Sequence, residues 1–482
     1  MCGIVGIADA GGVSFSLYSA LYALQHRGQE SAGIATFDGA VLHKHKGQGL
    51  VSEVFDESLL ASLEGSVGVG HVRYPTTGEK IPENIQPFNF RFRGKNIAVT
   101  HNGNLTNTAD LKETFEKRGQ IFCTTTDTEV IGNLIADELR ISGGMEDAVL
   151  HCMRILKGSY SVVVMLDDVI WAFRDPLGIR PLCVGKLPNG HIVCSESVAV
   201  DALNGTFIRD VRPGELVRID ATGITFRQIA VADHPAHCVF EYIYFARADS
   251  VVDGRLVYDV RRHIGQALSE NETICADLVS PVPDSGIAHA IGYSEASKIP
   301  YREGLIKNRY MGRTFIMPTQ EARENAVRIK LNPVKGHVLD KSVVLVDDSI
   351  VRGTTSRRII GLMREAGAAE VHMRIGSPAL KAPCYLGVDM PTRKELIASD
   401  KSNEEVRKSI GASSLRHVSI EALISAIGMD KNDLCVGCLT GVYPLAIGCE
   451  QCSRRRVELI GGTYQSNLGV FKEVSEARTS TK

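Results

Sequence analysis

The sequence predicts two domains in tandem: a strand-rich α+β domain at residues 2–232, then an α/β domain with a parallel sheet at residues 233–465. Three observations support this division. The chain has 482 residues, more than one ordinary core supports. Short apolar runs between Gly- and Asn-rich turns fill the first half, whereas strand-like and helix-like runs alternate in the second. Residues 466–482 are expected to form a tail.

The composition is that of a globular protein without a strong overall charge. Hydrophobic residues make up 44% and charged residues 23%, and the formal net charge is −2. This balance argues against nucleic acid or an anionic membrane as a partner. No apolar run is long enough to span a bilayer and no secretory signal is apparent, so a cytoplasmic location is expected. In that compartment the twelve cysteines should be thiols, metal ligands or catalysts.

In the first half, strands are expected within residues 66–75, 95–105, 159–175 and 191–197. A helix is expected at residues 127–140, where apolar side chains recur at helical spacing. Asp127 stands where this helix would take its N-cap.

In the second half, the pattern changes near residues 231–235. A helix is expected at residues 255–268, and a strand ending in a loop within 276–286. Residues 342–368 read as strand, loop and helix, and residues 370–378 as the next strand. This alternation is typical of βαβ units with parallel strands.

The most specific motif is VVLVDDSIVRGTT at residues 343–355. A buried strand ends at Asp347 and Asp348, where ligands bind in open α/β sheets. The following turn enters a helix, whose first N–H groups, with nearby hydroxyls, can hold a phosphate. Two carboxylates suit a ribose diol or Mg²⁺. The plainer interpretation is a solvated acidic turn at a strand end.

This motif resembles the signature of the type I phosphoribosyltransferases. The resemblance implies that Asp347 and Asp348 bind the ribose hydroxyls and Mg²⁺, and that Ser285 of the PVPDSG loop lies near the metal. It also implies that the following loop binds the 5-phosphate, through Ser349, Arg352, Gly353, Thr354 and Thr355. The basic stretch at 308–332 would be a lid over pyrophosphate; alternatively it is a solvated basic helix.

Cys2 is a candidate nucleophile. If Met1 is removed, Cys2 carries both a thiol and an α-amine with a reference pKa of about 7.7–8, so the nucleophile brings its own base. By itself this signal is weak, because free cysteines are usually buried core residues.

Three later motifs supply what an attacked glutamine needs. Arg73 at a strand end could clamp a carboxylate, and Asp127 could receive an ammonium group. Asn102 and Gly103, expected in a turn, could supply an amide and a backbone N–H to an oxyanion. Each also has a plain interpretation: a surface arginine, an N-cap and an Asn-Gly turn.

Together with MCGIVG and LQHRGQESAGIA, these motifs resemble the class II glutamine amidotransferase domain over about the first 230 residues. The resemblance implies a four-layer αββα N-terminal-nucleophile hydrolase. Arg27 and Tyr74 are further candidates for glutamine binding.

The two domains in one chain resemble the amidophosphoribosyltransferase family, up to about residue 460. That resemblance implies glutamine-dependent amination of 5-phosphoribosyl 1-diphosphate at the start of purine synthesis. It also implies purine nucleotides as feedback inhibitors and a homotetramer. Another amidotransferase, such as a sugar-phosphate aminase, would lack the motif at 343–355; a regulator that only senses substrate would lose Cys2 or the acidic pair.

Two C-x₂-C pairs, Cys435 with Cys438 and Cys449 with Cys452, favour a zinc site on spacing alone. The family resemblance instead implies a subset with a structural 4Fe–4S cluster, whose ligands would be Cys238, Cys384, Cys435 and Cys438. The roles of Cys449 and Cys452 stay open. The remaining cysteines are expected to be core thiols: Cys123, Cys152, Cys183, Cys194 and Cys275.

Overall fold

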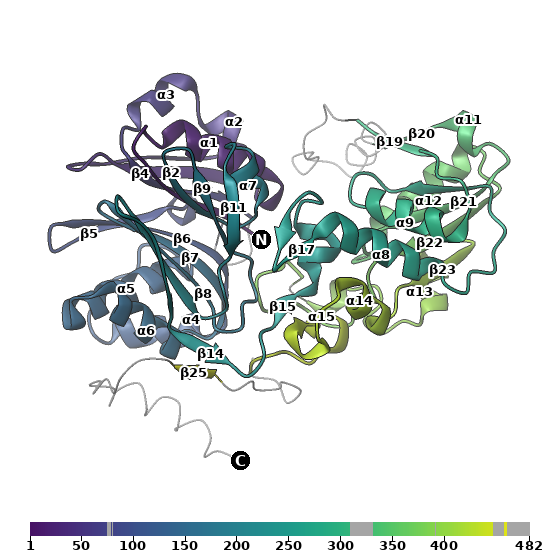
Figure 1. The fold of residues 1–482 in the computed structure, drawn as a ribbon. Helices are drawn as coiled ribbons and strands as arrows, with labels where there is room; N and C mark the ends of the chain where they lie inside the picture. Colours follow the sequence, from purple (N-terminus) through teal and green to yellow (C-terminus); the bar gives the residue numbers. More distant parts are fainter. Residues whose placement is uncertain (75–78, 80, 309–330, 391, 447–456, 460–482) are drawn as a thin grey trace, which may run out of the picture.

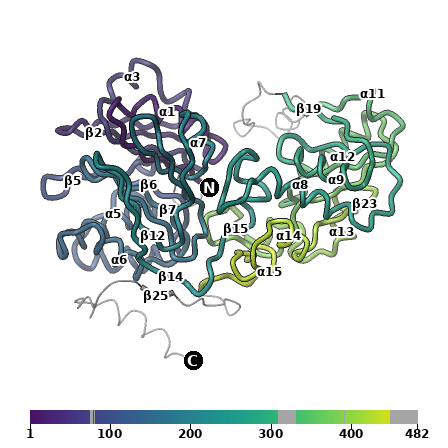
Figure 2. The backbone as a smooth tube through the Cα atoms, viewed as in Figure 1, coloured from purple at the N-terminus to yellow at the C-terminus, as the bar shows by residue number. Residues whose placement is uncertain are grey.

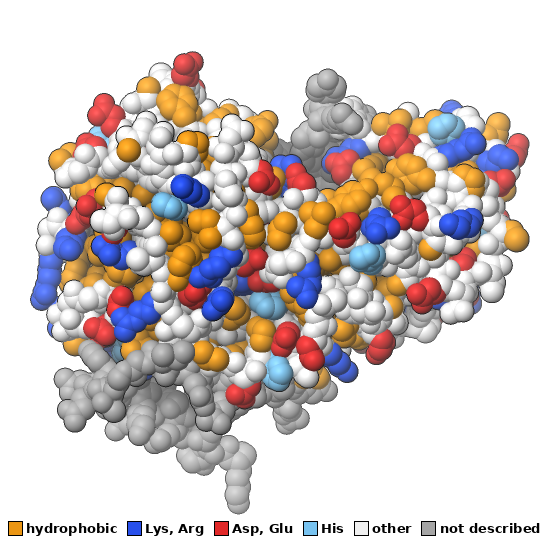
Figure 3. Space-filling model, in the orientation of Figure 1, with side chains coloured by type: hydrophobic (Ala, Val, Ile, Leu, Met, Phe, Trp, Pro, Cys, Tyr) orange, Lys and Arg blue, Asp and Glu red, His pale blue; other side chains and the backbone are white. Residues whose placement is uncertain are grey.

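The computed structural model describes residues 1–482 except 75–78, 80, 309–330, 391, 447–456 and 460–482. Figure 1 shows two lobes side by side, with the start of the chain at the boundary between them. Acidic and basic side chains are interspersed on the face drawn in Figure 3, as the near-zero net charge predicts.

The first lobe contains two antiparallel sheets. One has the order β11 (Thr206–Asp210), β9 (Cys183–Leu187), β10 (Gly190–Cys194), β1 (Gly3–Asp9), β4 (Val67–Arg73), β2 (Ser31–Phe37) and β3 (Leu42–Gln48). The other has the order β13 (Gly223–Gln228), β12 (Glu215–Asp220), β8 (Val169–Arg174), β7 (Gly158–Leu166), β6 (Lys95–Leu105) and β5 (Phe88–Phe92).

Helices cover the outer face of each sheet, giving four layers (Figure 1). The first sheet is covered by α1 (Ser14–Ala23), α2 (Val51–Val54), α3 (Glu57–Ser62) and α7 (Val198–Asp201). The second is covered by α4 (Thr108–Glu116), α5 (Thr128–Ser142) and α6 (Met145–Ile155). The two sheets approach closely at Gly6, where an added Cβ would lie 2.6 Å from a Val163 methyl group. The predicted αββα architecture is confirmed.

The second lobe contains a parallel sheet with the order β18 (Leu278–Pro281), β21 (Ser342–Asp347), β22 (Glu370–Ile375) and β23 (Ser414–His417). Its helices are α8 (Val257–Ser269), α9 (Ile287–Ser297), α11 (Lys335–Val338), α12 (Thr354–Glu365), α13 (Asn403–Ile410) and α14 (Ile420–Ile427). A short pair, β19 (Leu305–Lys307) with β20 (Leu331–Pro333), flanks the sheet. The predicted βαβ organisation is confirmed, because the strands are parallel and helices connect them.

One local expectation was wrong. Asn102 and Gly103 lie inside β6 and not in a turn, because pairing with β7 continues to Leu105 opposite Gly158. Gly103 is required there, since an added Cβ would lie 2.0 Å from the carbonyl oxygen of Ser159. Asp127 is the N-cap residue of α5, as expected, although its side chain makes no capping hydrogen bond and accepts from the backbone of β6.

Residues 434–440 lie at the boundary between the lobes, as the tube in Figure 2 shows. There β15 (His237–Cys238) pairs with β24 (Leu434–Cys435) in parallel, and α15 (Gly437–Thr440) follows. Further on, β14 (Ala230–Ala232) pairs with β25 (Val457–Leu459). A short π-helical segment (Glu241–Phe245) and the hairpin of β16 (Val251–Val252) and β17 (Arg255–Leu256) lie between β15 and α8. Among the helices described, none combines the length and apolar character needed to cross a bilayer.

Packing of α8 against α9 depends on glycine. An added Cβ at Gly265 would lie 1.9 Å from the carbonyl oxygen of His289, whereas Gly361 in α12 has open space. We expect Gly265→Ala to lower the free energy of unfolding by about 3 kcal/mol or more through overpacking. Gly361→Ala should be neutral or stabilising by about 0.5–1 kcal/mol. Urea unfolding followed by circular dichroism measures both, and equal stability of the two variants would contradict the packing argument.

Candidate functional site

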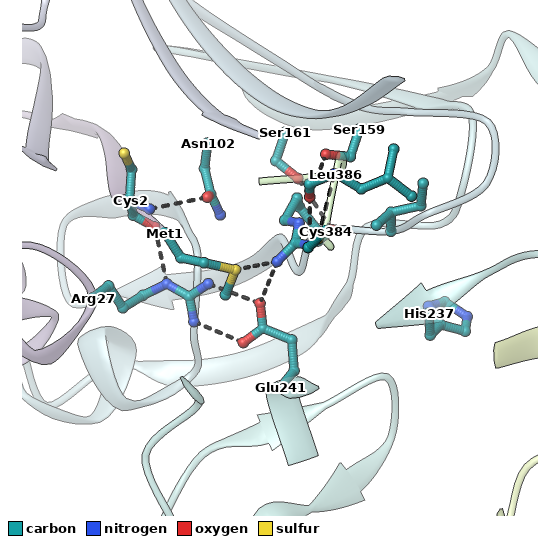
Figure 4. A network of polar contacts seen from close by, with 12 residues as sticks. Met1, Cys2, Arg27, Asn102, Ser159, Ser161, His237, Glu241, Cys384 and Leu386 are labelled. Atoms are coloured by element: carbon teal, nitrogen blue, oxygen red, sulfur yellow. Dashed lines mark hydrogen bonds and ion pairs between the residues drawn. The ribbon is translucent and has the colours of Figure 1, made fainter. Parts of the chain in front are cut away.

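Cys2 lies at the start of β1, buried beside the end of β6 (Figure 4). Its backbone nitrogen donates to Asn102 Oδ1 at 3.2 Å, and its Sγ lies 3.7 Å from the carbonyl oxygen of Tyr74. The nitrogen that would become the α-amine after loss of Met1 is therefore already held by a polar group. Met1 itself is buried, and burial lowers the pKa of its α-amine to about 5. A chain terminus at this depth is neutral at pH 7.

An unpartnered donor lies next to this nitrogen. Asn102 Nδ2 is buried and has no hydrogen-bond partner among the described residues. Because a buried donor without a partner is costly, such a group indicates a missing acceptor. Asn102 Oδ1 already binds Cys2, so Nδ2 is the atom available to an oxyanion formed by attack of Sγ. Gly103 is the next residue of the same strand.

The predicted ammonium acceptor is buried and charged. Asp127 Oδ2 accepts from the Leu105 nitrogen at 3.0 Å, and Oδ1 lies 3.3 Å from His101 Nδ1. Burial would raise the pKa of this carboxyl, but His101 and the Leu105 N–H hold the pKa below its usual value. The carboxylate is therefore anionic at neutral pH, as binding of an ammonium group requires.

The predicted carboxylate clamp, Arg73, is the last residue of β4 and is almost fully buried. Its Nη1 pairs with Glu30 Oε2 at 2.9 Å, and the other oxygen of Glu30 has no partner among the described residues. The guanidinium is thus held at the strand end beside Tyr74.

Arg27 lies beside Cys2, as expected of a residue near the glutamine site. Its Nε donates to the carbonyl oxygen of Cys2 at 3.0 Å, and its two terminal nitrogens bind Glu241 at 2.9 and 3.0 Å (Figure 4). Glu196 is a further partner. Burial opposes the charge, but the two carboxylates raise the pKa of Arg27. Every nitrogen of the guanidinium has a partner within the protein, and Arg27 supports the backbone of Cys2.

In the second lobe, β21 ends at Asp347, and Asp347 and Asp348 are 7% and 6% exposed. Gly353 adopts φ +73° before α12, and an added Cβ would lie 2.5 Å from Ile397. This left-handed residue sends the backbone into the helix, so that the helix begins at Thr354 beside the acidic pair.

Burial, together with the neighbouring carboxylate, raises the pKa of Asp347 well above its usual value. Burial also raises the pKa of Asp348, although hydrogen bonds from Ser285 and Ser349 and the charge of Arg261 oppose this. Two buried carboxyl groups that resist ionisation fit a site completed by a divalent cation or a diol. Ser285 reaches Asp348, as the predicted magnesium site requires.

The remaining predicted phosphate ligands lie around the same turn. Arg352 is exposed, and its Nε pairs with Glu395 at 3.0 Å. Of the predicted lid at 308–332, residues 309–330 lie outside the described residues.

Four predicted cluster ligands gather at the boundary between the lobes. Cys238 and Cys435 are Cα partners in the β15–β24 pair, and Cys438 follows in α15. All are free thiols in one apolar cluster with Cys384. Burial, followed by the charges of the other three, raises the pKa of Cys438 well above its usual value. Arg180 interacts electrostatically with Cys238 and Cys384, which suits a group with net negative charge.

Among the described residues, no group of three His, Cys, Asp or Glu side chains is placed to hold a metal ion. The four predicted cluster thiols are among the residues that this statement covers, whereas Cys449 and Cys452 of the zinc interpretation lie outside the described residues. Of the expected core thiols, Cys152, Cys183 and Cys194 are buried. The expectation for Cys123 and Cys275 was wrong, because both are exposed.

Sequence reasoning missed three residues around Cys2. Glu241, Glu196 and His101 are buried polar groups that hold Arg27 or Asp127. His101 could have been found, since it precedes Asn102 in the same motif. Glu241 gave no signal, because its importance depends on contact with a residue 214 positions away.

Comparison with known proteins agrees with this geometry. A glutamine amidotransferase domain family matches residues 71–202. Amidophosphoribosyltransferase from Methanothermobacter thermautotrophicus is 52% identical over 92% of this chain and 94% of its own length. The Archaeoglobus fulgidus protein of the same name is 49% identical over 94% of this chain and all of its own length. A solved structure of Bacillus subtilis glutamine phosphoribosylpyrophosphate amidotransferase with ADP and GMP superposes with a TM-score of 0.87, at 45% identity, covering 93% of this chain and 99% of that one.

Asp347 and Asp348 are predicted to destabilise the ligand-free protein while they are needed for ligand binding. We expect Asp347→Asn to raise the melting midpoint of the ligand-free protein by about 2–4 °C for each kcal/mol of relieved repulsion. The folded-state pKa lies above the unfolded value, so the wild type loses stability as pH rises between the two. The gain should therefore be larger at pH 8 than at pH 5.

Melting curves with and without Mg²⁺ and phosphoribosyl diphosphate measure this effect. The variant should lose the stabilisation by ligand that the wild type shows. Asp400→Asn, at an exposed position, is the control and should change neither quantity. A lower midpoint for Asp347→Asn at pH 8 would contradict the argument.

Proposed function

The chain belongs to the amidophosphoribosyltransferase family, and from this premise we propose how its residues transfer the amide nitrogen of glutamine to 5-phosphoribosyl 1-diphosphate. The products are 5-phosphoribosylamine, glutamate and pyrophosphate, and the reaction is the first step of purine synthesis. The observation that carries the assignment of roles is the contact of Cys2 nitrogen with Asn102, whose Nδ2 is left without a partner.

Glutamine binds with its α-carboxylate at Arg73 and its α-ammonium at Asp127, and Tyr74 flanks the site. Cys2 Sγ attacks the amide carbon while the α-amine of Cys2 accepts the thiol proton. Asn102 Nδ2 and the Gly103 N–H stabilise the oxyanion. The C–N bond breaks, the α-amine returns the proton, and ammonia leaves. Water then hydrolyses the thioester to glutamate.

Ammonia must reach the second lobe unprotonated, since ammonium is not a nucleophile. The apolar cluster at the boundary, which keeps Leu386, Leu439 and Tyr443 after Met1 is lost, supports a passage that excludes water. At the second site the ammonia nitrogen bonds to C1 of the ribose and the C1–O bond to pyrophosphate breaks. Asp347 and Asp348 orient the ribose, and the turn from Ser349 to Thr355 binds the 5-phosphate.

The proposed function includes two bound cofactors, a magnesium ion and an iron–sulfur cluster. Mg²⁺, held by Ser285, Asp347 and Asp348, would neutralise charge on the pyrophosphate leaving group. A 4Fe–4S cluster on Cys238, Cys384, Cys435 and Cys438 would join three distant segments and be structural. The free thiols, their mutual electrostatic interaction and the adjacent Arg180 support this donor set.

Location, assembly and regulation are further parts of the proposal. We place the protein in the cytoplasm as a homotetramer. Purine nucleotides would act as feedback inhibitors; the related structure from Bacillus subtilis, which contains ADP and GMP, supports this.

The assigned roles predict a split between two activities. Cys2→Ala should abolish glutamine-dependent synthesis of 5-phosphoribosylamine, and Asn102→Ala should reduce it by about 10²–10³-fold. Both should keep ammonia-dependent synthesis, because the second lobe is unchanged. Pyrophosphate release with either nitrogen source measures this, with Cys123→Ala, at an exposed thiol, as the control. Glutamine use by Cys2→Ala would refute the nucleophile.

The proposed 4Fe–4S cluster predicts how much iron and sulfide the purified protein contains. Anaerobically purified protein should contain about four iron and four sulfide per chain, with loss of both and of stability in Cys438→Ser. Cys275→Ser, at an exposed thiol, should retain them. Stoichiometric zinc without sulfide would contradict the cluster and restore the zinc interpretation.

A further inference from the structure

A short loop of the second lobe, Tyr385–Gly387, lies directly against the strand that carries Asn102 and Gly103. Ser159 Oγ donates to the Leu386 carbonyl oxygen at 2.9 Å (Figure 4), and Asn104 Nδ2 donates to the Tyr385 carbonyl oxygen at 2.9 Å. Ser159 belongs to β7, opposite Asn104 of β6. The two strands that frame the proposed oxyanion site are therefore both bonded to this loop.

The closest approach is between two glycines. A Cβ added to Gly387 would lie 3.2 Å from the carbonyl carbon of Gly103 and 3.4 Å from its Cα. Gly387 also adopts φ +95°, a conformation that favours glycine. The backbone of the loop thus rests on the backbone of Gly103, with no side chain on either residue to separate them.

On its other side the loop packs into the second lobe. Leu386 is 1% exposed within the core at the boundary, and Cys384 N donates to the Met390 carbonyl oxygen at 3.0 Å. Leu386 N donates to Cys384 Sγ at 3.4 Å, and the Leu386 carbonyl oxygen also accepts from Arg180 Nη2 of the first lobe at 2.5 Å. Because the loop packs in the second lobe and is bonded to the first, it can transmit the position of the second lobe to β6.

We propose that Tyr385–Gly387 is a positioning element for the oxyanion site of the first lobe. It holds Gly103, and with it the adjacent Asn102, at the distance from Cys2 that the tetrahedral intermediate needs. This inference rests on the proposed roles of Asn102 and Gly103. It makes hydrolysis of glutamine depend on a glycine of the phosphoribosyltransferase lobe that contacts neither substrate.

Gly387→Ala tests the contact, with Gly411→Ala as the matched control. Gly411 also has positive φ, at +79°, but has open space around it, so both variants carry the same backbone strain. Only Gly387→Ala displaces Gly103. We expect the kcat for glutamine hydrolysis to fall about 10-fold in Gly387→Ala with the KM for glutamine unchanged, since Arg73 and Asp127 are not moved. Gly411→Ala should have the same kcat and KM for glutamine hydrolysis as the wild type.

Alkylation of Cys2 by iodoacetamide separates positioning of the oxyanion site from general damage. This reaction needs the thiol and no oxyanion, so its rate should be unchanged in Gly387→Ala, as should ammonia-dependent synthesis. Ser159→Ala removes the hydrogen bond to Leu386 and the one that Ser159 Oγ accepts from Asn104 N, and Asn104→Ala removes the side-chain bond to Tyr385. Both should show the same pattern with a smaller loss of kcat and without backbone strain, and agreement between them assigns the loss to the loop. They decide the question if Gly387→Ala does not fold.

The outcomes distinguish this inference from the proposed function. Equal kcat in Gly387→Ala and Gly411→Ala, with Asn102→Ala inactive toward glutamine, would overturn the positioning role alone. Slower alkylation together with a raised KM would also overturn it, because it would show a disturbed active site and not a displaced oxyanion site. Full glutamine hydrolysis by Asn102→Ala would overturn the proposed function itself.

Discussion

The buried contact between Arg27 and the backbone of Cys2 is the interaction on which the site depends. A chain terminus normally frays, since nothing follows it to hold it in place. Here the Cys2 carbonyl accepts from Arg27 and the Cys2 nitrogen donates to Asn102, so the first residues are bonded at both ends. Burying a guanidinium is costly unless carboxylates compensate its charge, and Glu241 and Glu196 do so.

Because Glu241 belongs to the second lobe, the nucleophile of the first lobe is held by both. A second buried ion pair also joins the two lobes. Arg174 of β8 binds Asp253 at 2.7 Å, and His237 binds the same carboxylate at 2.9 Å. Burial would raise the pKa of Asp253, but Arg174 holds it far below its usual value. Such pairs tolerate few alternative arrangements, since breaking one leaves a buried charge. They therefore define how the lobes meet.

The two sites differ in how their buried charges are compensated. Around Cys2, the buried charges of Arg27 and Asp127 have partners, and the neutral donor Asn102 Nδ2 is among the buried polar atoms without one in the described part of the chain. At the end of β21, two carboxyl groups are adjacent and burial raises the pKa of both, while the charge of Asp348 raises that of Asp347 further. The first arrangement favours an intermediate that develops negative charge, and the second favours a ligand that carries positive charge or hydroxyl donors.

The sequence by itself determined the features that local patterns encode. These are the fold classes of both domains, most strands and helices, the candidate nucleophile Cys2, and the acidic pair before the glycine turn. These are readable because alternating apolar residues, a strand-terminal Asp-Asp and a left-handed glycine act within about ten residues. Local pattern misplaced Asn102 and Gly103 in a turn, and it gave no sign of the carboxylates that hold Arg27 beside Cys2. Only the tertiary structure decided that Gly103 continues a strand against Ser159, that Arg27 meets Glu241, and that Gly387 rests on Gly103. Those contacts join residues far apart in the chain, so their effect arises from packing between the lobes and leaves no local signal.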